Sequence, residues 1–472
     1  NWAKEKIVEI PPVIIDPSPD TVPGILHEEV ALYRILPPGE KRKLIKLVNE
    51  FLREYTFEGR DGLLVTDPMK IAFAGQACIL KLGVDYRIFT GFKRIILHPD
   101  QFMMNGAEYY TYDADDEIHF SWKSVSEAIN QLRKTWQPLL LRLSNNLSKD
   151  QDWRTVKSRF KDCLNEYRSR CDNKTLYWWE WDGVKNVDHL FRTLTDDFFC
   201  RPYCMHQNLP NLYKAYKDFY CCDPLYWIEE KHRELAAKPF PNLWQKCLWR
   251  NVKHYSRLPS DLRTKLHGLI HIFLDEITFE KNGFRRITDK MRLCVAAEAC
   301  ILIVNRTFHD YRRIELVEIW KGEPEGKDDW GGDANQRRVR LNWHWTKDGM
   351  GDEDDNYNIT MHEFAHVLDN VDDDIAQSVP EPKHSPNRKM WEDLLELEYP
   401  LLEEAYKSGL GHVIREYGLH TYGEEKRRAE FFTCATEAFF ERSTRLQKDC
   451  PRIYRALRTF YQLDPANWDI PT

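Results

Sequence analysis

Residues 361–369 read Met-His-Glu-Phe-Ala-His-Val-Leu-Asp, and this stretch carries the clearest chemical pattern of the chain. The four-residue spacing of His362 and His366 places two imidazoles on one face of a predicted helix, where both can bind one Zn²⁺ ion. Glu363 lies beside them, where a carboxylate can hold a water molecule and take its proton. Thr360 and Glu363 could instead form a capping box, and the two imidazoles could be surface groups. The apolar neighbours favour a buried helix, on which unpaired imidazoles would be costly, so the pattern predicts a metal site.

A catalytic zinc ion needs a third protein ligand and an open position for water. No third histidine follows at the short spacing used by metzincins, so the ligand should come from elsewhere in the chain. The best source is a helix predicted over Arg427–Glu441, which carries Glu430 and Glu437 on one face. Two helical turns separate these carboxylates by about 10 Å, so only one of them would bind the ion. The other would be a supporting partner or a solvated surface glutamate.

Two further polar residues are candidates for supporting the chemistry. Tyr422 could donate a hydrogen bond to a tetrahedral oxyanion, or it could be a packing residue in a turn. Asp369 lies three residues after His366 and could accept a hydrogen bond from an imidazole, which would fix the tautomer of the ring. A surface position at the end of the helix is the alternative for Asp369. The acidic run at 352–355 could attract a basic peptide, or it could be a solvated loop.

The chain contains two similar halves. Asn49–Leu80 and His271–Leu302 align without a gap at an offset of 222 residues and share the sequences Thr-Phe-Glu and Ala-Cys-Ile-Leu. Pro210–Trp227 and Pro451–Trp468 align at an offset of 241 residues. These matches predict a tandem duplication. The predicted organisation is an N-terminal extension (1–27), a first copy (28–228), a linker (229–249) and a second copy (250–472).

Each copy is predicted to be rich in helices and to contain a small sheet, which is an α+β fold class. Helices are predicted from apolar periodicity around residues 44–52, 69–82 and 291–304. Strands are predicted at Arg94–Leu97, Ile118–Trp122, Leu316–Ile319 and Val339–Trp343.

Only the second copy carries the metal-binding pattern. At the offset of 241 residues, Glu430 corresponds to His189 and Glu437 to Asp196, and no His-Glu-x-x-His pattern precedes residue 362. The first copy is therefore predicted to be a non-catalytic domain that packs against, shapes or shields the active one. It also contains a group of potential metal ligands whose spacing favours buried core cysteines over a metal cluster: Cys200, Cys204, His206, Cys221 and Cys222.

The overall composition argues against several classes of function. The 472 residues include 68 Lys and Arg against 75 Asp and Glu, so there is no basic excess for a nucleic-acid binder. No apolar run reaches the roughly 18 residues of a transmembrane helix, and the first residues lack a signal-peptide core. The 12 cysteines lack the regular spacing of a disulfide-rich secreted domain. We therefore expect a cytoplasmic protein.

The stretch from His362 to Asp369 is followed by Ala-Glu-Phe-Phe at 429–432 and Glu-Ala-Phe-Phe at 437–440, and together they resemble the Mlc titration factor A family of zinc-dependent peptidases. The resemblance covers the second copy, and the first copy follows the same outline without the pattern. It implies a zincin-like fold of the gluzincin type, related to anthrax lethal factor, with Glu430 as the third zinc ligand and Glu363 as the general base. Characterised members of the family are linked to aminopeptidase activity and to binding of a transcriptional repressor.

These observations support two main hypotheses. The first is a zinc metallopeptidase, possibly an aminopeptidase, that holds one Zn²⁺ in the second copy and hydrolyses a peptide or protein substrate through a zinc-bound water. The substrate backbone would add to the strand Val339–Trp343, so Leu341 and Trp343 are predicted to bind substrate. The second is a regulatory binding protein of the same fold that sequesters a protein partner, such as a transcriptional regulator, with weak or latent peptidase activity. A structural zinc site without an open position is a third possibility.

Overall fold

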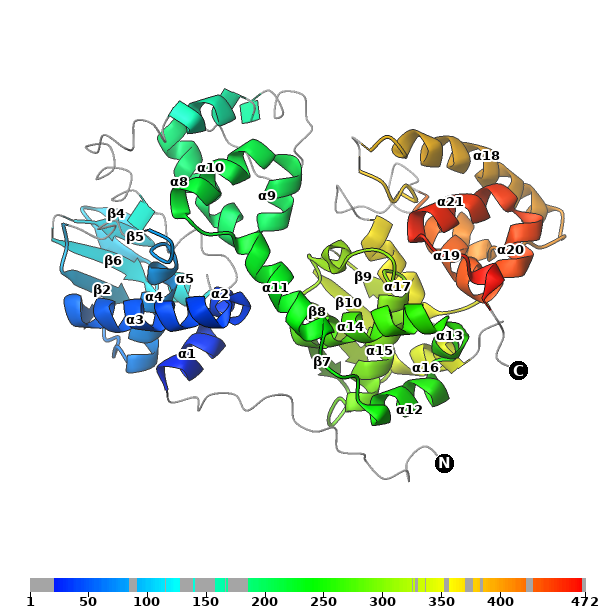
Figure 1. The fold of residues 1–472 in the computed structure, drawn as a ribbon, viewed down its shortest axis with the longest axis horizontal. Helices are drawn as coiled ribbons and strands as arrows, with labels where there is room; N and C mark the ends of the chain where they lie inside the picture. The colour runs from blue at the N-terminus through cyan, green and yellow to red at the C-terminus, as the bar shows by residue number, and fades with distance from the viewer. Residues whose placement is uncertain are drawn as a thin grey trace. The chain divides into compact units, whose positions relative to one another are not determined.

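The computed structural model describes residues 21–84, 91–114, 116–127, 139–140, 158–165, 167–168, 186–324, 326, 330–335, 337–351, 356–369, 377–382, 385–421 and 428–468. The chain divides into two compact units, which we call the N-terminal unit (residues 12–233) and the C-terminal unit (residues 234–472). Each unit has its own cluster of buried apolar side chains, and neither cluster includes a residue of the other unit. Figure 1 labels most of the helices and strands of both units.

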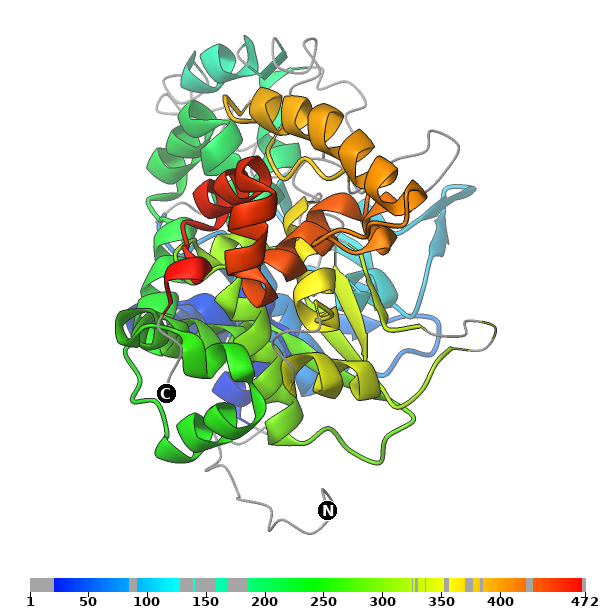
Figure 2. The same ribbon diagram turned by 90° about the vertical axis from the view of Figure 1, so that its right-hand side faces the viewer.

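The C-terminal unit combines a four-stranded sheet with helices. Its strands are β7 (Thr278–Asn282), β8 (Leu316–Trp320), β9 (Gly332–Ala334) and β10 (Arg338–Asn342). Its helices are α12 (Asn242–Asn251), α13 (Lys253–Arg257), α14 (Ser260–Glu276), α15 (Asp289–Ile301), α16 (Trp343–Gly351), α17 (Ile359–Asp369), α18 (Arg388–Lys407), α19 (Phe431–Glu441), α20 (Ser443–Asp449) and α21 (Pro451–Tyr461), with short 3-10 turns η1 (Phe308–Tyr311), η2 (Glu416–Leu419) and η3 (Pro465–Asn467). In Figure 2, α18 (orange) lies beside α21 (red), against which it packs.

The sheet of the C-terminal unit has the strand order β7-β8-β10-β9. Strands β7, β8 and β10 are parallel, and β9 is antiparallel to β10. The inner strands alternate apolar and polar residues, so Val317, Ile319, Val339 and Leu341 are buried in the core. Helix α17 packs against β9 and β10 as well as α15, α16 and α19, so the sheet supports the helix that carries the metal-binding pattern.

The N-terminal unit has a sheet of the same order. Its strands are β1 (Thr56–Gly59), β2 (Arg94–His98), β3 (Phe102–Met104), β4 (Ala107–Tyr109), β5 (Thr111–Asp113) and β6 (Glu117–Ser121). The order is β1-β2-β6-β5, with β1, β2 and β6 parallel and β5 antiparallel, while β3 and β4 form a separate hairpin. Its labelled helices are α1 (Val22–Glu29), α2 (Ala31–Ile35), α3 (Pro38–Glu54), α4 (Asp67–Ile79), α5 (Trp122–Glu127), α8 (Val187–Cys200), α9 (Pro202–Asn208) and α10 (Pro210–Tyr220). Helix α11 (Pro224–Ala236) includes the boundary between the two units.

Three pairs of corresponding helices in the two units have equal lengths. The helices α3 and α14, which precede the first strand of each sheet, both have 17 residues. The next helices, α4 and α15, both have 13 residues, and each begins after a threonine. Near the end of each unit, α10 and α21 both have 11 residues and both end at a residue with positive φ. The predicted α+β class, rich in helices with small sheets, is confirmed for the described part of the chain.

Some expected element boundaries were wrong. Trp343 begins helix α16 and is not part of the strand, which ends at Asn342. The helix expected over Arg427–Glu441 begins only at Phe431. The boundary between the two units lies inside the stretch expected to be a linker, which is largely helical because both of its prolines follow the end of α11 at Ala236.

Candidate metal centre

Helix α17 is positioned by a side-chain cap at its start. The backbone N–H of Met361 donates to Asn358 Oδ1 over 3.0 Å, so the helix begins at Ile359. Thr360 therefore lies inside the helix, and the capping box that the sequence allowed between Thr360 and Glu363 does not form. The side chain of Glu363 therefore does not cap the helix.

Three side chains of the predicted metal centre meet between α17 and the start of α19. Glu430 Oε2 lies 2.9 Å from His362 Nε2 and 3.2 Å from His366 Nε2. His362 and Glu430 are buried, whereas the His366 side chain keeps 14% of its exposure, so solvent reaches the group from that side. Two imidazole nitrogens and one carboxylate oxygen within 4.8 Å of one another are a donor set that suits Zn²⁺. The residues present therefore fit the predicted metal.

Glu430 is held at the residue immediately before α19, one position outside the helix. Its carbonyl oxygen accepts a hydrogen bond from Cys434 N at 3.1 Å, and Thr433 Oγ1 lies 2.9 Å from the same oxygen. Burial disfavours the charge of Glu430, but the imidazoles of His362 and His366 hold the pKa of this carboxyl well below its usual range. Glu430 is thus ionised and has a fixed backbone, as a metal ligand requires.

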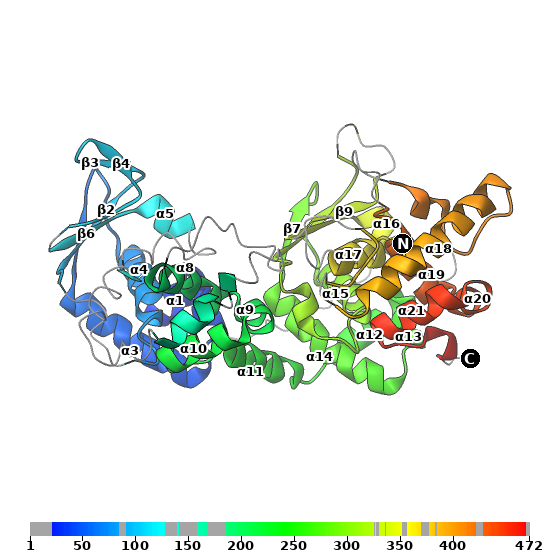
Figure 3. The ribbon, with the colours of Figure 1, turned by 90° about the horizontal axis from the view of Figure 1, so that it is seen from above.

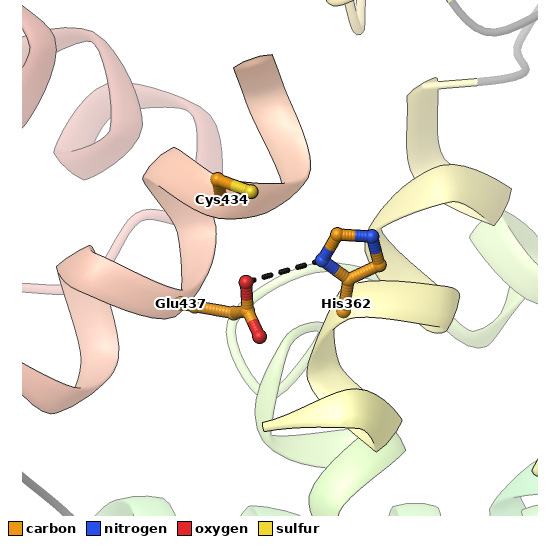
Figure 4. A group of neighbouring side chains, drawn as sticks. All are labelled: His362, Cys434 and Glu437. Carbon is orange, nitrogen blue, oxygen red and sulfur yellow. Dashed lines mark hydrogen bonds and ion pairs between the residues drawn. The ribbon is translucent and has the colours of Figure 1, made fainter. Parts of the chain in front are cut away.

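Glu437 supports His362 from the other side of the ring. Its Oε2 lies 3.1 Å from His362 Nδ1, and Figure 4 shows this contact, with Cys434 on the same helix. Asn358 N donates to Glu437 Oε1 over 2.9 Å, and the Arg415 guanidinium pairs with Oε2. Burial opposes the charge of Glu437, but Arg415 and His362 keep its pKa below the usual value. A carboxylate at Nδ1 fixes the tautomer that leaves Nε2 available for a metal ion.

A second group of potential ligands shares one member with the first. Atoms of His362, Cys434 and Glu437 lie within 4.8 Å of one another. Arg415 already pairs with Glu437, so a metal cation placed there would face a partly buried guanidinium. Burial also raises the pKa of the Cys434 thiol, which favours the neutral form that binds metals poorly. This second group therefore supports His362 and is poorly suited to a second ion.

The expectation for Asp369 needs correction. Asp369 Oδ2 accepts a hydrogen bond from Ser378 N at 2.6 Å, and the structure gives it no hydrogen bond to His362 or His366. Ser378 Oγ in turn contacts Arg428 O at 2.5 Å and accepts from Phe432 N at 2.9 Å. Asp369 thus fixes the segment that flanks Glu430. Glu437 takes the position beside the imidazole because it projects from the helix that faces α17.

The other predicted site residues lie elsewhere. Leu341 is fully buried in the core, and its strand β10 is paired on both sides, with β8 and with β9. A substrate strand therefore cannot add to β10, and the sheet edge next to β10 is formed by β9. Trp343 lies at the start of α16, partly buried against the core. Tyr422 lies outside the described residues.

The carboxylate of Glu363 lies beside the edge strand β9. Its Oε2 is buried and has no hydrogen-bond partner among the described residues. A Cβ placed on Gly332 of β9 would lie 3.0 Å from Glu363 Cγ and from Oε1, so the strand approaches this carboxylate closely. Burial raises the pKa of Glu363 to about 8. A cation bound by the neighbouring ligands would favour the carboxylate form.

Several residues of this site escaped the sequence analysis. Arg415 pairs with Glu437, and Asn358 Nδ2 donates to Glu298 Oε2 over 2.9 Å, which ties α15 to the cap of α17. Tyr417 packs its ring 5.8 Å from the ring of His362 and remains 38% exposed. These residues carry no motif, and they come together only through long-range packing.

The described part of the N-terminal unit has no comparable ligand group at the corresponding position. Asp196, which aligns with Glu437, is buried and accepts a bond from Cys200 Sγ at 3.6 Å. Cys221 Sγ contacts Asp218 O, and Cys204 is a buried free thiol. Among the described residues, no three-ligand group is formed by the candidates named above: Cys200, Cys204, His206, Cys221 and Cys222.

A helix with the His-Glu-x-x-His pattern, joined by a carboxylate that just precedes a later helix, is typical of zinc-dependent metallopeptidases. The chain belongs to the family of glucose-regulated metallopeptidases M90, whose profile matches residues 4–129 and 227–462. The resemblance to the Mlc titration factor A family is thereby confirmed. The chain is also similar to an uncharacterized protein of Synechocystis, with 27% identity over 256 residues, which are 51% of this chain and 90% of the relative.

Among the helices of the described residues, none is both long enough and apolar enough to cross a bilayer.

Proposed function

We propose that this chain is a zinc-dependent peptidase with one catalytic centre, in the C-terminal unit. The observation that carries the proposal is the convergence of His362 Nε2, His366 Nε2 and Glu430 Oε2 beside the unpartnered carboxylate of Glu363. Three protein ligands leave a coordination position open, as catalytic zinc sites require. Membership of a metallopeptidase family supports a peptide or protein as the substrate.

Each residue of the centre has a defined task in peptide hydrolysis. A bound zinc ion supplies Lewis acidity that polarises a carbonyl and lowers the pKa of a coordinated water. Glu363 takes the proton of the attacking water and passes it to the departing amine. Glu437, neutralised by Arg415, holds the His362 ring in one orientation and tautomer.

Two tyrosines are candidates for donating a hydrogen bond to the developing oxyanion. Tyr422, suggested by the sequence, remains a proposal because it lies outside the described residues. Tyr417 has a half-exposed ring beside His362, and its hydroxyl could reach a substrate there. Comparison of Tyr417→Phe and Tyr422→Phe would separate them, since loss of the donor should lower kcat more than it raises KM.

Strand β9 is the proposed docking edge for the substrate backbone. It pairs with β10 on one side, and within the described sheet no strand pairs with its other side. It also lies against Glu363, so an extended peptide added to β9 would place its carbonyls near the catalytic carboxylate.

Substituting Gly332 with alanine tests this placement of β9. The added Cβ would lie 2.7 Å from Arg340 O and 3.0 Å from Glu363 Oε1, so the strand or the carboxylate must shift. We expect peptide hydrolysis to fall on the order of tenfold while zinc content is unchanged. The matched control is Gly351→Ala, where a Cβ would meet nothing within 4 Å. Equal activity of the two variants would contradict the proposed role of β9.

We also propose that the chain arose by tandem duplication and that the first copy is not catalytic. The shared strand order and the equal helix lengths of the two units support this proposal. The Synechocystis relative supports it as well, because about nine tenths of that protein align with about half of this chain. The alternative function, sequestration of a protein partner with weak peptidase activity, would use the same fold.

The peptidase proposal is tested by metal-dependent cleavage. The full chain is incubated with a mixture of peptides, half with free N-termini and half acetylated, and products are identified by mass spectrometry. We expect cleavage that a chelator abolishes and that stoichiometric zinc restores. Cleavage only of the free peptides would indicate an aminopeptidase. Cleavage that survives complete removal of the metal would contradict the proposal.

A further inference from the structure

A buried carboxylate lies behind the start of helix α17. Glu298, in α15, is 0% exposed, and so is His254, in α13. His254 Nδ1 lies 3.4 Å from Glu298 Oε1, and Asn358 Nδ2 donates to Glu298 Oε2 over 2.9 Å. Figure 3 shows α15 beside α17, against which it packs. A buried carboxylate is costly without partners, and these two contacts provide one partner for each oxygen.

Asn358 connects this carboxylate to the metal centre through all four of its polar groups. Its side-chain Nδ2 donates to Glu298, and its Oδ1 accepts from Met361 N at 3.0 Å, which caps α17. Its backbone N–H donates to Glu437 Oε1 over 2.9 Å. Its backbone oxygen accepts from His362 N at 2.9 Å. One residue therefore joins α15 both to the helix that carries His362 and to the carboxylate that faces the His362 ring.

The carboxylate of Glu298 fixes which way the Asn358 amide points. The two ends of an amide have nearly the same shape, but one end donates and the other accepts. A half-turn of the amide would bring its oxygen against Glu298 Oε2 and its amino group against the N–H of Met361. Acceptor would then face acceptor and donor would face donor, so both hydrogen bonds would be lost. Glu298 thus selects the orientation in which Asn358 caps α17.

We propose that Glu298 is a positioning residue of the metal centre and acts on His362 through Asn358. This role rests on the proposed function, because it concerns the same zinc ion. Two routes lead from Asn358 to His362: the hydrogen bond to the His362 N–H, and the hydrogen bond to Glu437, whose Oε2 lies 3.1 Å from His362 Nδ1. A ring that is held in one orientation binds zinc more tightly than a ring without such support. His254 contacts the second oxygen of Glu298 and so helps to hold the carboxylate in place.

The pair of Glu298 and His254 is specific to the C-terminal unit. Helices α2 and α4 have the same bounds as α13 and α15 after a shift of 222 residues. At this offset Glu298 corresponds to Gln76 and His254 to Leu32, both of which are buried. The N-terminal unit thus has a neutral amide and an apolar side chain where the C-terminal unit has a carboxylate and an imidazole. This difference agrees with a task for Glu298 at the metal centre, because the described residues of the N-terminal unit form no three-ligand group.

The zinc affinity of the full chain, measured by competition with a chromophoric chelator, tests this role. Glu298→Met keeps the size of the side chain but removes the acceptor, and we expect zinc affinity to fall about tenfold or more. Glu298→Gln is the conservative variant, because its amide oxygen can still accept from Asn358 while its amino group faces His254 Nδ1. Its affinity should be within about threefold of the wild type, since the hydrogen bond remains. Leu293→Ala, which is buried in the same helix, is the control for loss of packing and should leave the affinity unchanged.

An exchange of donor and acceptor supplies a second test with variants of unchanged shape. In Asn358→Asp a carboxylate oxygen faces Glu298, and zinc affinity should fall about tenfold. Adding Glu298→Gln gives the pair a donor again, so the double variant should return to within about threefold of the wild type.

Two results would overturn the role of Glu298 alone, with zinc binding by the wild type leaving the proposed function intact. They are equal affinities of Glu298→Met and Leu293→Ala, and a double variant that recovers nothing. A wild type that binds no zinc would overturn the proposed function, and the role of Glu298 with it. If Glu298→Met fails to fold, the exchange of donor and acceptor remains decisive.

Discussion

Replacing Glu363 with glutamine is expected to lower peptide hydrolysis by about 10²- to 10⁴-fold while the metal content stays unchanged. Glutamine has the same shape but cannot take a proton from water. Glu363 forms no hydrogen bond within the described structure, and it is not among the three side chains that converge as ligands, so the metal should stay bound. Initial rates and zinc content are measured on the same protein samples. Glu403→Gln, on the exposed face of α18, is the matched control.

This variant also separates the two classes of function. A peptidase loses its activity, whereas a binding protein keeps its partner after the same change. Unaltered hydrolysis in Glu363→Gln would show that Glu363 is not the general base. Loss of zinc together with activity would assign Glu363 to the ligands instead.

Replacing Glu437 with leucine is expected to destabilise the C-terminal unit by about 3 kcal/mol, because it leaves the guanidinium of Arg415 without its buried partner. Glu437 is fully buried, and Arg415 retains 24% of its side-chain exposure. The loss of stability should therefore be at the lower end of the range for broken buried ion pairs. Unfolding by urea is followed in the presence of a chelator, so that lost zinc affinity does not add to the difference.

The double variant Glu437→Leu/Arg415→Met provides the control. Removal of both charges should restore most of the stability, since neither group is then left unpaired. Zinc affinity should nevertheless remain about 10- to 100-fold weaker than in the wild type, because His362 Nδ1 still lacks its carboxylate. If the double variant recovered full zinc affinity, Glu437 would have no role in orienting His362. If it were no more stable than Glu437→Leu, the ion pair would not account for the cost.

The local part of the site was predictable from the sequence. His362, Glu363 and His366 lie within five residues, so helical periodicity alone places them together. Glu430 could be chosen over Glu437 only through the family resemblance, since both lie on the same predicted face. The structure gives the physical reason for the division of roles: Glu430 faces Nε2 of His362, and Glu437 faces Nδ1.

The non-local part was not predictable. The alternation of Val339 and Leu341 identifies a strand, but it does not reveal whether that strand lies at the edge of the sheet or pairs with strands on both sides. Strand β9, which pairs with the outer side of β10, has three residues and is too short to show an alternating hydrophobic pattern. His254, Glu298 and Asn358 are separated by 44 and 60 residues and meet only because α15 packs against both α13 and α17.

The most direct test of the central claim is the zinc content of the purified full chain beside His362→Ala and Glu430→Ala. Metal is measured by mass spectrometry on protein prepared without chelators. The geometry predicts that each variant contains one zinc ion fewer than the wild type, because both side chains belong to the same three-ligand group. Equal zinc content in the wild type and both variants, or a wild type without zinc, would contradict the assignment of a metal centre to the C-terminal unit.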